Sequence, residues 1–153
     1  MKRVELKLNL QMVAPLLDVI KAAADDLEPR LAIDIKDPVG DPELKDSWTS
    51  ELLSGQNSDI QVLLGMFDRD FFVTGMIAFD PGNCEPNLRA CSALRLRLRE
   101  AHLKLLGDDS LESNEVPYAE MPEEQQKAFA AYVFLATLQE LLVHHLDPNV
   151  MEE

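Results

Sequence analysis

Cysteine and glycine are scarce in this sequence, and each scarcity excludes a class of protein. The 153 residues include two cysteines and six glycines. If one helix carries both Cys84 and Cys91, a separation of seven residues puts them about 10 Å apart, which is too far for a disulfide. No Gly-x-Gly-x-x-Gly or P-loop pattern occurs, so we find no sequence signal for a phosphate-binding loop.

Basic residues and long apolar runs are also few. Fourteen Lys and Arg residues stand against 28 Asp and Glu residues, which gives a formal net charge of −14. A surface this acidic repels phosphate backbones and anionic lipid, so we expect neither nucleic acid nor a membrane as a partner. No apolar run approaches the ~20 residues of a membrane span, and residues 1–7 lack the apolar core of a secretory signal. We therefore expect a cytoplasmic protein.

Motifs that define a reaction are missing as well. Neither cysteine has a histidine neighbour, and the sequence contains no Gly-x-Ser-x-Gly elbow, no zinc-spaced cysteine pair and no Glu-x-x-His pair. The nearest approach to a metal set is Glu140 with His144, which His102 could join from another helix. We predict no metal, no cofactor and no catalytic residues, and we favour a protein that is not an enzyme.

The composition is that of an ordinary globular chain, with 46% apolar and 27% charged residues, and its length fits a single domain over 1–153. Residues 3–8 alternate between apolar and polar, which is typical of a short strand. Residues 73–79 are rich in β-branched and aromatic side chains. We expect these two segments to pair as a two-stranded element, with continuation of the preceding helix as the alternative for 71–79.

Helical spacing dominates the first half. It predicts a helix over 11–27, then a connector over 28–43 with a short extended piece at 31–33. A helix over 43–54 would end at Gly55 and bury Trp48, Leu52 and Leu53. The N-cap pair Ser58-Asp59 would then open another helix, whose apolar positions are Ile60, Leu63, Leu64, Phe67 and Phe71.

The second half carries two long predicted helices. The first runs from Pro86 to Gly107 and has two opposed apolar stripes, Cys91/Leu94/Leu98/Ala101/Leu105 and Leu96/Leu103. The last runs from Pro122 to about Leu146. Between them we expect an acidic surface loop over 108–121, and after them a C-terminal tail over 147–153. The predicted fold class is a mainly α protein, a small bundle of about four to five helices with the short β element.

Two segments resemble a known family. Residues 87–96 (NLRACSALRL) and residues 132–143 (YVFLATLQELLV) are similar, in sequence and in order, to two stretches of the bacterial domain-of-unknown-function family number 2017. The resemblance covers roughly the C-terminal half. This chain departs from the family pattern at Asn87, Ser92-Ala93 and Val133. The resemblance implies a small helical fold in a bacterial protein, and it implies no activity.

Two functional hypotheses follow. The first is a non-enzymatic interaction or regulatory protein that binds another protein or itself as a homodimer, through an interaction face made of Leu96, Arg97, Leu103 and Lys104. The second is a domain that binds a small anionic ligand, or acts on it, with a polar cluster of Arg95, Gln139 and Glu140 between the last two helices. We expect Arg95 and Glu140 to form a structural ion pair. An Arg with no carboxylate partner in a polar pocket would favour the second hypothesis, whereas a packed Arg–carboxylate pair together with an exposed apolar face would favour the first.

Overall fold

The computed structural model describes residues 3–33, 40–113 and 116–146. Within them the chain is mainly α-helical with one short two-stranded antiparallel sheet, as predicted. The C-terminal tail over 147–153 lies outside the described residues. No helix in the described part of the chain is long and apolar enough to cross a membrane.

The sheet joins the start of the chain to its middle. Strand β1 (Val4–Lys7) pairs antiparallel with β2 (Met76–Phe79), with Val4 opposite Phe79. A short helix, α3 (Arg69–Thr74), precedes β2 and ends at Gly75, which has a φ of +73°. A Cβ at Gly75 would lie 2.8 Å from the carbonyl oxygen of Leu8. Glycine is required here because the backbone is left-handed and the two chain segments approach so closely.

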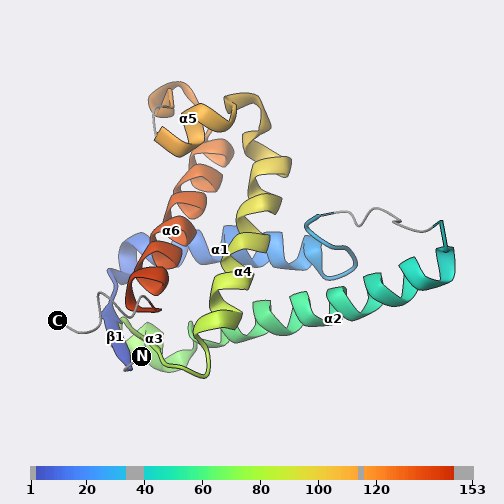
Figure 1. Cartoon of the computed structure of the whole chain (residues 1–153). Helices are drawn as coiled ribbons and strands as arrows, with labels where there is room; N and C mark the ends of the chain where they lie inside the picture. The colour runs from blue at the N-terminus through green and yellow to red at the C-terminus, as the bar shows by residue number, and fades with distance from the viewer. Residues whose placement is uncertain (1–2, 34–39, 114–115, 147–153) are drawn as a thin grey trace.

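Three helices enclose the core. Helix α1 (Leu10–Leu27) crosses α4 (Cys84–Leu98) and α6 (Glu123–Leu146), which lie side by side and run in opposite directions (Figure 1). Asn9 caps α1 by accepting hydrogen bonds from the backbone N–H groups of Gln11 and Met12. The largest fully buried side chains come from these helices and from the segments packed on them: Phe71, Phe79, Ile20, Leu27, Leu63, Leu94, Leu98, Leu103, Leu135, Leu138, Leu142 and the polar Asn87.

Helix α2 (Pro42–Gly65) corrects the expectation of two helices separated at Gly55. Asp41 caps it, and the helix runs through Gly55 without a break. Glycine in an α-helix costs only about 1 kcal/mol relative to alanine, which does not stop a helix supported at one end. The C-terminal half of α2 packs on α4, whereas the N-terminal half projects from the body (Figure 1). The predicted buried edge is therefore wrong, since Trp48 is 38% exposed and Leu52 is 54% exposed.

The end of α4 corrects the prediction of two opposed stripes. The chain leaves α4 through a π-helical turn over Arg99–Leu103 and a 3-10 turn over Lys104–Leu106, and it turns at Gly107. Each α-helical residue advances by about 100°, so an unbroken helix would place Leu105 beneath Leu98. The wider π turn takes up one extra residue and rotates the rest by about that angle. Leu103 is consequently buried, and Leu105 is 96% exposed.

The segment over 108–121 is more structured than the predicted acidic loop. It contains a short helix, α5 (Asp108–Ser113), and a 3-10 turn over Tyr118–Glu120. Leu111 and Met121 from this segment are buried in the core. The acidic residues obscured this because the apolar side chains that anchor the described part of the segment, Leu111, Val116 and Met121, are too far apart to give a detectable period.

Candidate functional site

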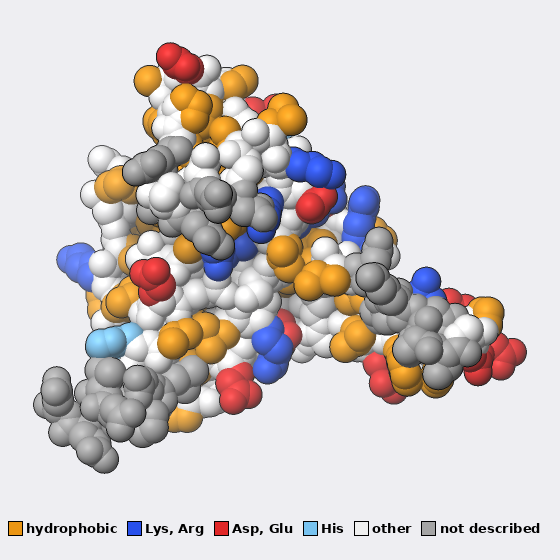
Figure 2. Space-filling model, turned by 45° about the horizontal axis from the view of Figure 1, so that its top comes forward, with side chains coloured by type: hydrophobic (Ala, Val, Ile, Leu, Met, Phe, Trp, Pro, Cys, Tyr) orange, Lys and Arg blue, Asp and Glu red, His pale blue; other side chains and the backbone are white. Residues whose placement is uncertain are grey.

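An open apolar groove lies where the projecting half of α2 leaves the body. Its volume is about 890 Å³. Figure 2 shows hydrophobic side chains gathered in this hollow, with Lys and Arg side chains beside it. The groove is lined by three walls: Leu31, Ala32 and Ile33; Glu51, Leu52, Gly55, Gln56 and Asp59 of α2; and Leu88, Arg89, Ser92, Ala93 and Leu96 of α4 with Gln139 and Val143 of α6.

A single glutamine holds the first wall in place. The Gln56 Nε2 donates to the carbonyl oxygens of Leu27, at 3.2 Å, and Arg30, at 2.9 Å. Its Oε1 accepts from the backbone N–H of Ala32 at 3.0 Å. The amide therefore bonds carbonyls at the end of α1 and just beyond it, where the helical hydrogen-bond ladder has ended, and it holds the segment at 31–33 beside α2. The extended piece expected there is instead a bend.

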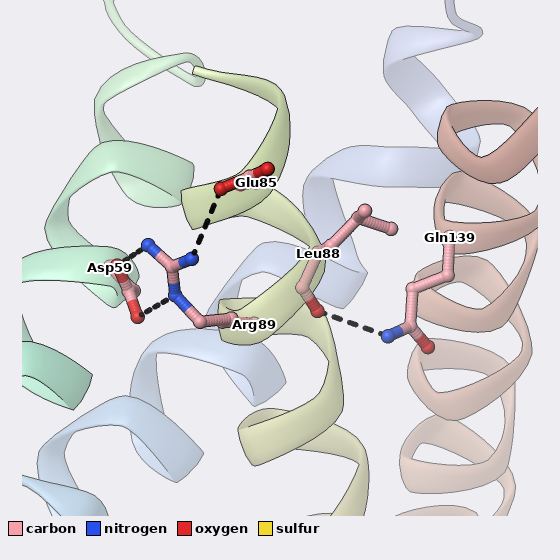
Figure 3. A network of polar contacts seen from close by, with 5 residues as sticks. All are labelled: Asp59, Glu85, Leu88, Arg89 and Gln139. Carbon is pink, nitrogen blue, oxygen red and sulfur yellow. Dashed lines mark hydrogen bonds and ion pairs between the residues drawn. The ribbon is translucent and has the colours of Figure 1, made fainter. Parts of the chain in front are cut away.

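The polar floor of the groove connects α4 to α6. Gln139 Nε2 donates to the carbonyl oxygen of Leu88 at 3.0 Å and to the Ser92 hydroxyl at 2.6 Å (Figure 3 shows the first). Its Oε1 accepts from Arg95 at 2.6 Å. The amide thus uses both its donor and its acceptor between the helices, and Gln139 is a residue that fixes their spacing.

Arg95 does not form the expected ion pair with Glu140. Its guanidinium donates to Gln139 and, at 3.1 Å, to the Tyr132 hydroxyl, and it lies 4.6 Å from the centre of the Tyr132 ring. Within the described residues no carboxylate is within ion-pair distance of Arg95, and its Nε is buried without a partner. Glu140 is exposed. One residue along α6 is a rotation of about 100°. Gln139 therefore reaches Arg95, whereas Glu140 lines a pocket of about 270 Å³ that Arg95 also lines, without coming within ion-pair distance of it.

A second polar contact closes the groove on the side of α2. Arg89 binds Asp59 through two hydrogen bonds, at 2.9 and 3.1 Å, and lies 3.7 Å from Glu85 (Figure 3). The hydrogen bonds to Asp59 raise the pKa of the Arg89 side chain, with burial opposing the shift. The bidentate geometry fixes the relative position of α2 and α4 at the groove.

The predicted interaction face is not one surface. Leu96 is half-buried in the groove wall, whereas Leu103 is fully buried in the core because of the π turn. Arg97 lies 3.4 Å from Asp26 of α1, and Lys104 lies 3.7 Å from Glu100 on its own helical segment. Of the four residues, only Leu96 belongs to the groove. The sequence offered one signal for the groove, the apolar position Leu52, which was interpreted as core together with Trp48.

The cysteine and histidine side chains form no reactive cluster within the described ranges. Both cysteines are buried and free, in agreement with the expected absence of a disulfide. Burial raises the pKa of the Cys91 thiol to about 12. His102 lies 3.8 Å from Glu124 of α6 rather than near His144. No group of three or more His, Cys, Asp or Glu side chains suited to a metal ion occurs in the described part of the chain.

Comparisons of this chain with models of protein families, with curated proteins and with solved structures found no match. The resemblance of its C-terminal half to domain-of-unknown-function family number 2017 therefore stays a prediction.

Proposed function

We propose that this chain is a non-enzymatic protein-interaction module that binds an amphipathic helix in the groove between α2, α4 and the segment at 31–33. The observation that carries the proposal is the size and character of the groove, about 890 Å³ with mostly apolar walls. Leu52, Ile33 and Val143 at its rim are all more than half exposed. An apolar groove with a few polar groups at its edge is the usual receptor for the apolar face of a helix.

The direct test is crosslinking inside cells that make the protein. A photoreactive amino acid replaces Leu52 in the groove, and in a matched strain it replaces Val73, which is equally apolar and 78% exposed but outside the groove. We expect crosslinks from position 52 to map, by mass spectrometry, to one apolar helix face. Leu96→Asp should abolish them without affecting the fold. Crosslinks no stronger from position 52 than from position 73 would refute the proposal.

One observation favours the second candidate, a site for a small anion. Arg95 has no carboxylate partner in the described residues, and with Ser92, Leu96, Arg99 and Tyr132 it lines a pocket of about 270 Å³ next to the groove. A guanidinium in such a pocket suits a carboxylate or phosphate group. Titration with inorganic phosphate, followed by amide chemical shifts, should then perturb α4 around Ser92. Arg95→Met should remove the perturbation and Arg97→Met should leave it unchanged; no saturable shift would reject this candidate.

A further inference from the structure

Two side chains of opposite charge line one small pocket on α6 without reaching each other. The pocket has a volume of about 270 Å³, and both Arg95 and Glu140 belong to its lining. No ion pair joins them, and neither has an ion-pair partner elsewhere among the described residues. A pocket that holds one uncompensated charge of each sign suits a ligand that also carries one charge of each sign.

The position of Arg95 is fixed by neutral groups. Its guanidinium donates to Gln139 Oε1 at 2.6 Å and to the Tyr132 hydroxyl at 3.1 Å, and it lies 4.6 Å from the centre of the Tyr132 ring. A guanidinium has five N–H donors, so these two hydrogen bonds leave donors over. Neither acceptor carries a charge. The contacts therefore hold Arg95 in place and leave its positive charge without a counter-charge.

Glu140 lies at the other end of the same face of α6. Tyr132, Ala136 and Glu140 recur every four residues, so they form one row along the helix, and all three line the pocket. Tyr132 and Glu140 are about 12 Å apart along the helix axis. Ala136, between them, carries only a methyl group and leaves space. This row separates the two charges while both remain in one pocket.

The rest of the lining is suited to a short aliphatic group. Leu111 of α5, Val133 and Ala136 supply apolar surface. The Thr137 hydroxyl donates to the carbonyl oxygen of Val133 at 2.9 Å, so its oxygen can still accept a hydrogen bond. The volume is below the roughly 300–1,000 Å³ of a site for a drug-sized molecule. The ligand must therefore be small.

We propose that this pocket binds a small free amino acid. Its carboxylate accepts hydrogen bonds from Arg95, its ammonium group donates to Glu140, and its aliphatic part packs on Leu111 and Val133. The net charge of the chain, −14, repels a simple anion but exerts no net force on a zwitterion. A free amino acid therefore matches both the pocket and the charge of the whole protein.

This inference goes beyond the groove and does not rest on helix binding there. It shares Arg95 with the candidate site for a small anion, and Glu140 distinguishes the two ligands. A carboxylate in the pocket repels phosphate and attracts an ammonium group, so a change at Glu140 has opposite effects on them.

The first experiment follows the backbone amide chemical shifts of the full chain during titration with valine and with γ-aminobutyrate, whose two charges are farther apart. We expect saturable shifts at Ala136 and Thr137 with at least one of them. Isovalerate and butyrate lack the ammonium group, whereas isobutylamine and butylamine lack the carboxylate. Each analogue should bind at least about ten-fold more weakly than its parent amino acid, because a hydrogen bond between charged groups is lost.

The second experiment removes the carboxylate from the protein. Glu140→Gln should raise the dissociation constant of the amino acid at least about ten-fold and should not weaken isovalerate or butyrate, which have no ammonium group. The side chain is exposed, so the fold is retained. Glu124→Gln is the matched control, because it removes the same charge from the same helix outside the pocket. It should leave the affinity for the amino acid unchanged.

Three results would overturn the inference. They are the absence of saturable shifts with both amino acids, equal binding of an amino acid and its analogue without the ammonium group, and equal effects of Glu140→Gln and Glu124→Gln. If phosphate binds at Arg95 and the amino acids do not, the anion candidate stands and this inference fails. Crosslinking from position 52 reports on the groove alone, so the proposed helix binding is accepted or rejected separately.

Discussion

The π turn after α4 buries Leu103 and exposes Leu105, which is the reverse of what an unbroken helix would do. Two alanine substitutions test this directly. Leu103 is fully buried, so Leu103→Ala removes buried methyl groups and leaves a cavity. Such substitutions cost about 2–5 kcal/mol of the free energy of unfolding. For a chain of this length the loss corresponds to a fall of roughly 4–20 °C in Tm. Leu105 is 96% exposed, so Leu105→Ala should change stability by less than about 0.5 kcal/mol.

The assay is urea unfolding of both variants and the parent, monitored by circular dichroism. If the dependence of the unfolding free energy on urea concentration has the same slope in all three proteins, their unfolding midpoints can be compared directly. A regular α-helix through residue 105 would give the opposite ranking, with Leu105→Ala the damaging change. Equal costs, or a larger cost at Leu105, would therefore refute the π turn. Gln125 supports the turn by donating to the carbonyl oxygen of His102 at 3.1 Å.

Three other predictions concern polar groups and a thiol. Arg95→Met should lower the free energy of unfolding in urea by about 1–3 kcal/mol, because it leaves Gln139 Oε1 and the Tyr132 hydroxyl without their donor. Glu140→Gln should leave stability unchanged. Equal effects of the two substitutions would contradict the hydrogen bonds assigned to Arg95. Gln56→Ala should cost about 1–3 kcal/mol and speed hydrogen exchange at the Ala32 amide, while Gln61→Ala, an exposed change on the same helix, should do neither. Because burial raises the pKa of the Cys91 thiol to about 12, the unfolded chain loses the thiol proton at a lower pH than the folded chain does. The free energy of unfolding should therefore fall from about pH 9 upwards, by about 1.4 kcal/mol per pH unit. If a Cys91→Ala variant shows the same fall, Cys91 is not its cause.

Local patterns were sufficient for the strands and the last helix. Alternation over residues 3–8 predicted β1, and Pro122 followed by Glu123 predicted the start of α6, because each signal depends on neighbours in sequence. The burial of Leu103 and the exposure of Leu105 could not be predicted, because a π turn is selected by packing against α6 and not by its own residues. At the candidate site the sequence predicted a polar cluster of Arg95, Gln139 and Glu140; the structure bonds Arg95 to Gln139, and the ion pair expected between Arg95 and Glu140 is absent. The wrong partner for the ion pair reflects how coarsely periodicity fixes the rotation of a helix.

The groove was beyond the reach of sequence patterns for a similar reason. Its walls come from residues near 31, 55 and 93, and their meeting depends on Gln56 holding the end of α1. Gly55 was interpreted as a helix stop because glycine is common there. In the structure Gly55 leaves a position of α2 without a side chain but does not end the helix. The exposed apolar residues beside it, Trp48 and Leu52, were interpreted as core, because apolar spacing does not reveal which helices have neighbours.

The hydrogen bonds of Gln56 also have an evolutionary consequence. They join Ala32 to a residue 24 positions later, and Asn57 adds a contact to the carbonyl oxygen of Glu28. These hydrogen bonds hold the two ends of the intervening chain together at the body of the protein. Closing a longer loop costs only about 0.6 kcal/mol for each doubling of its length. Insertions and deletions of whole helical turns near the N-terminal end of α2 can therefore accumulate in descendants of this sequence while the core of α1, α4 and α6 stays constant.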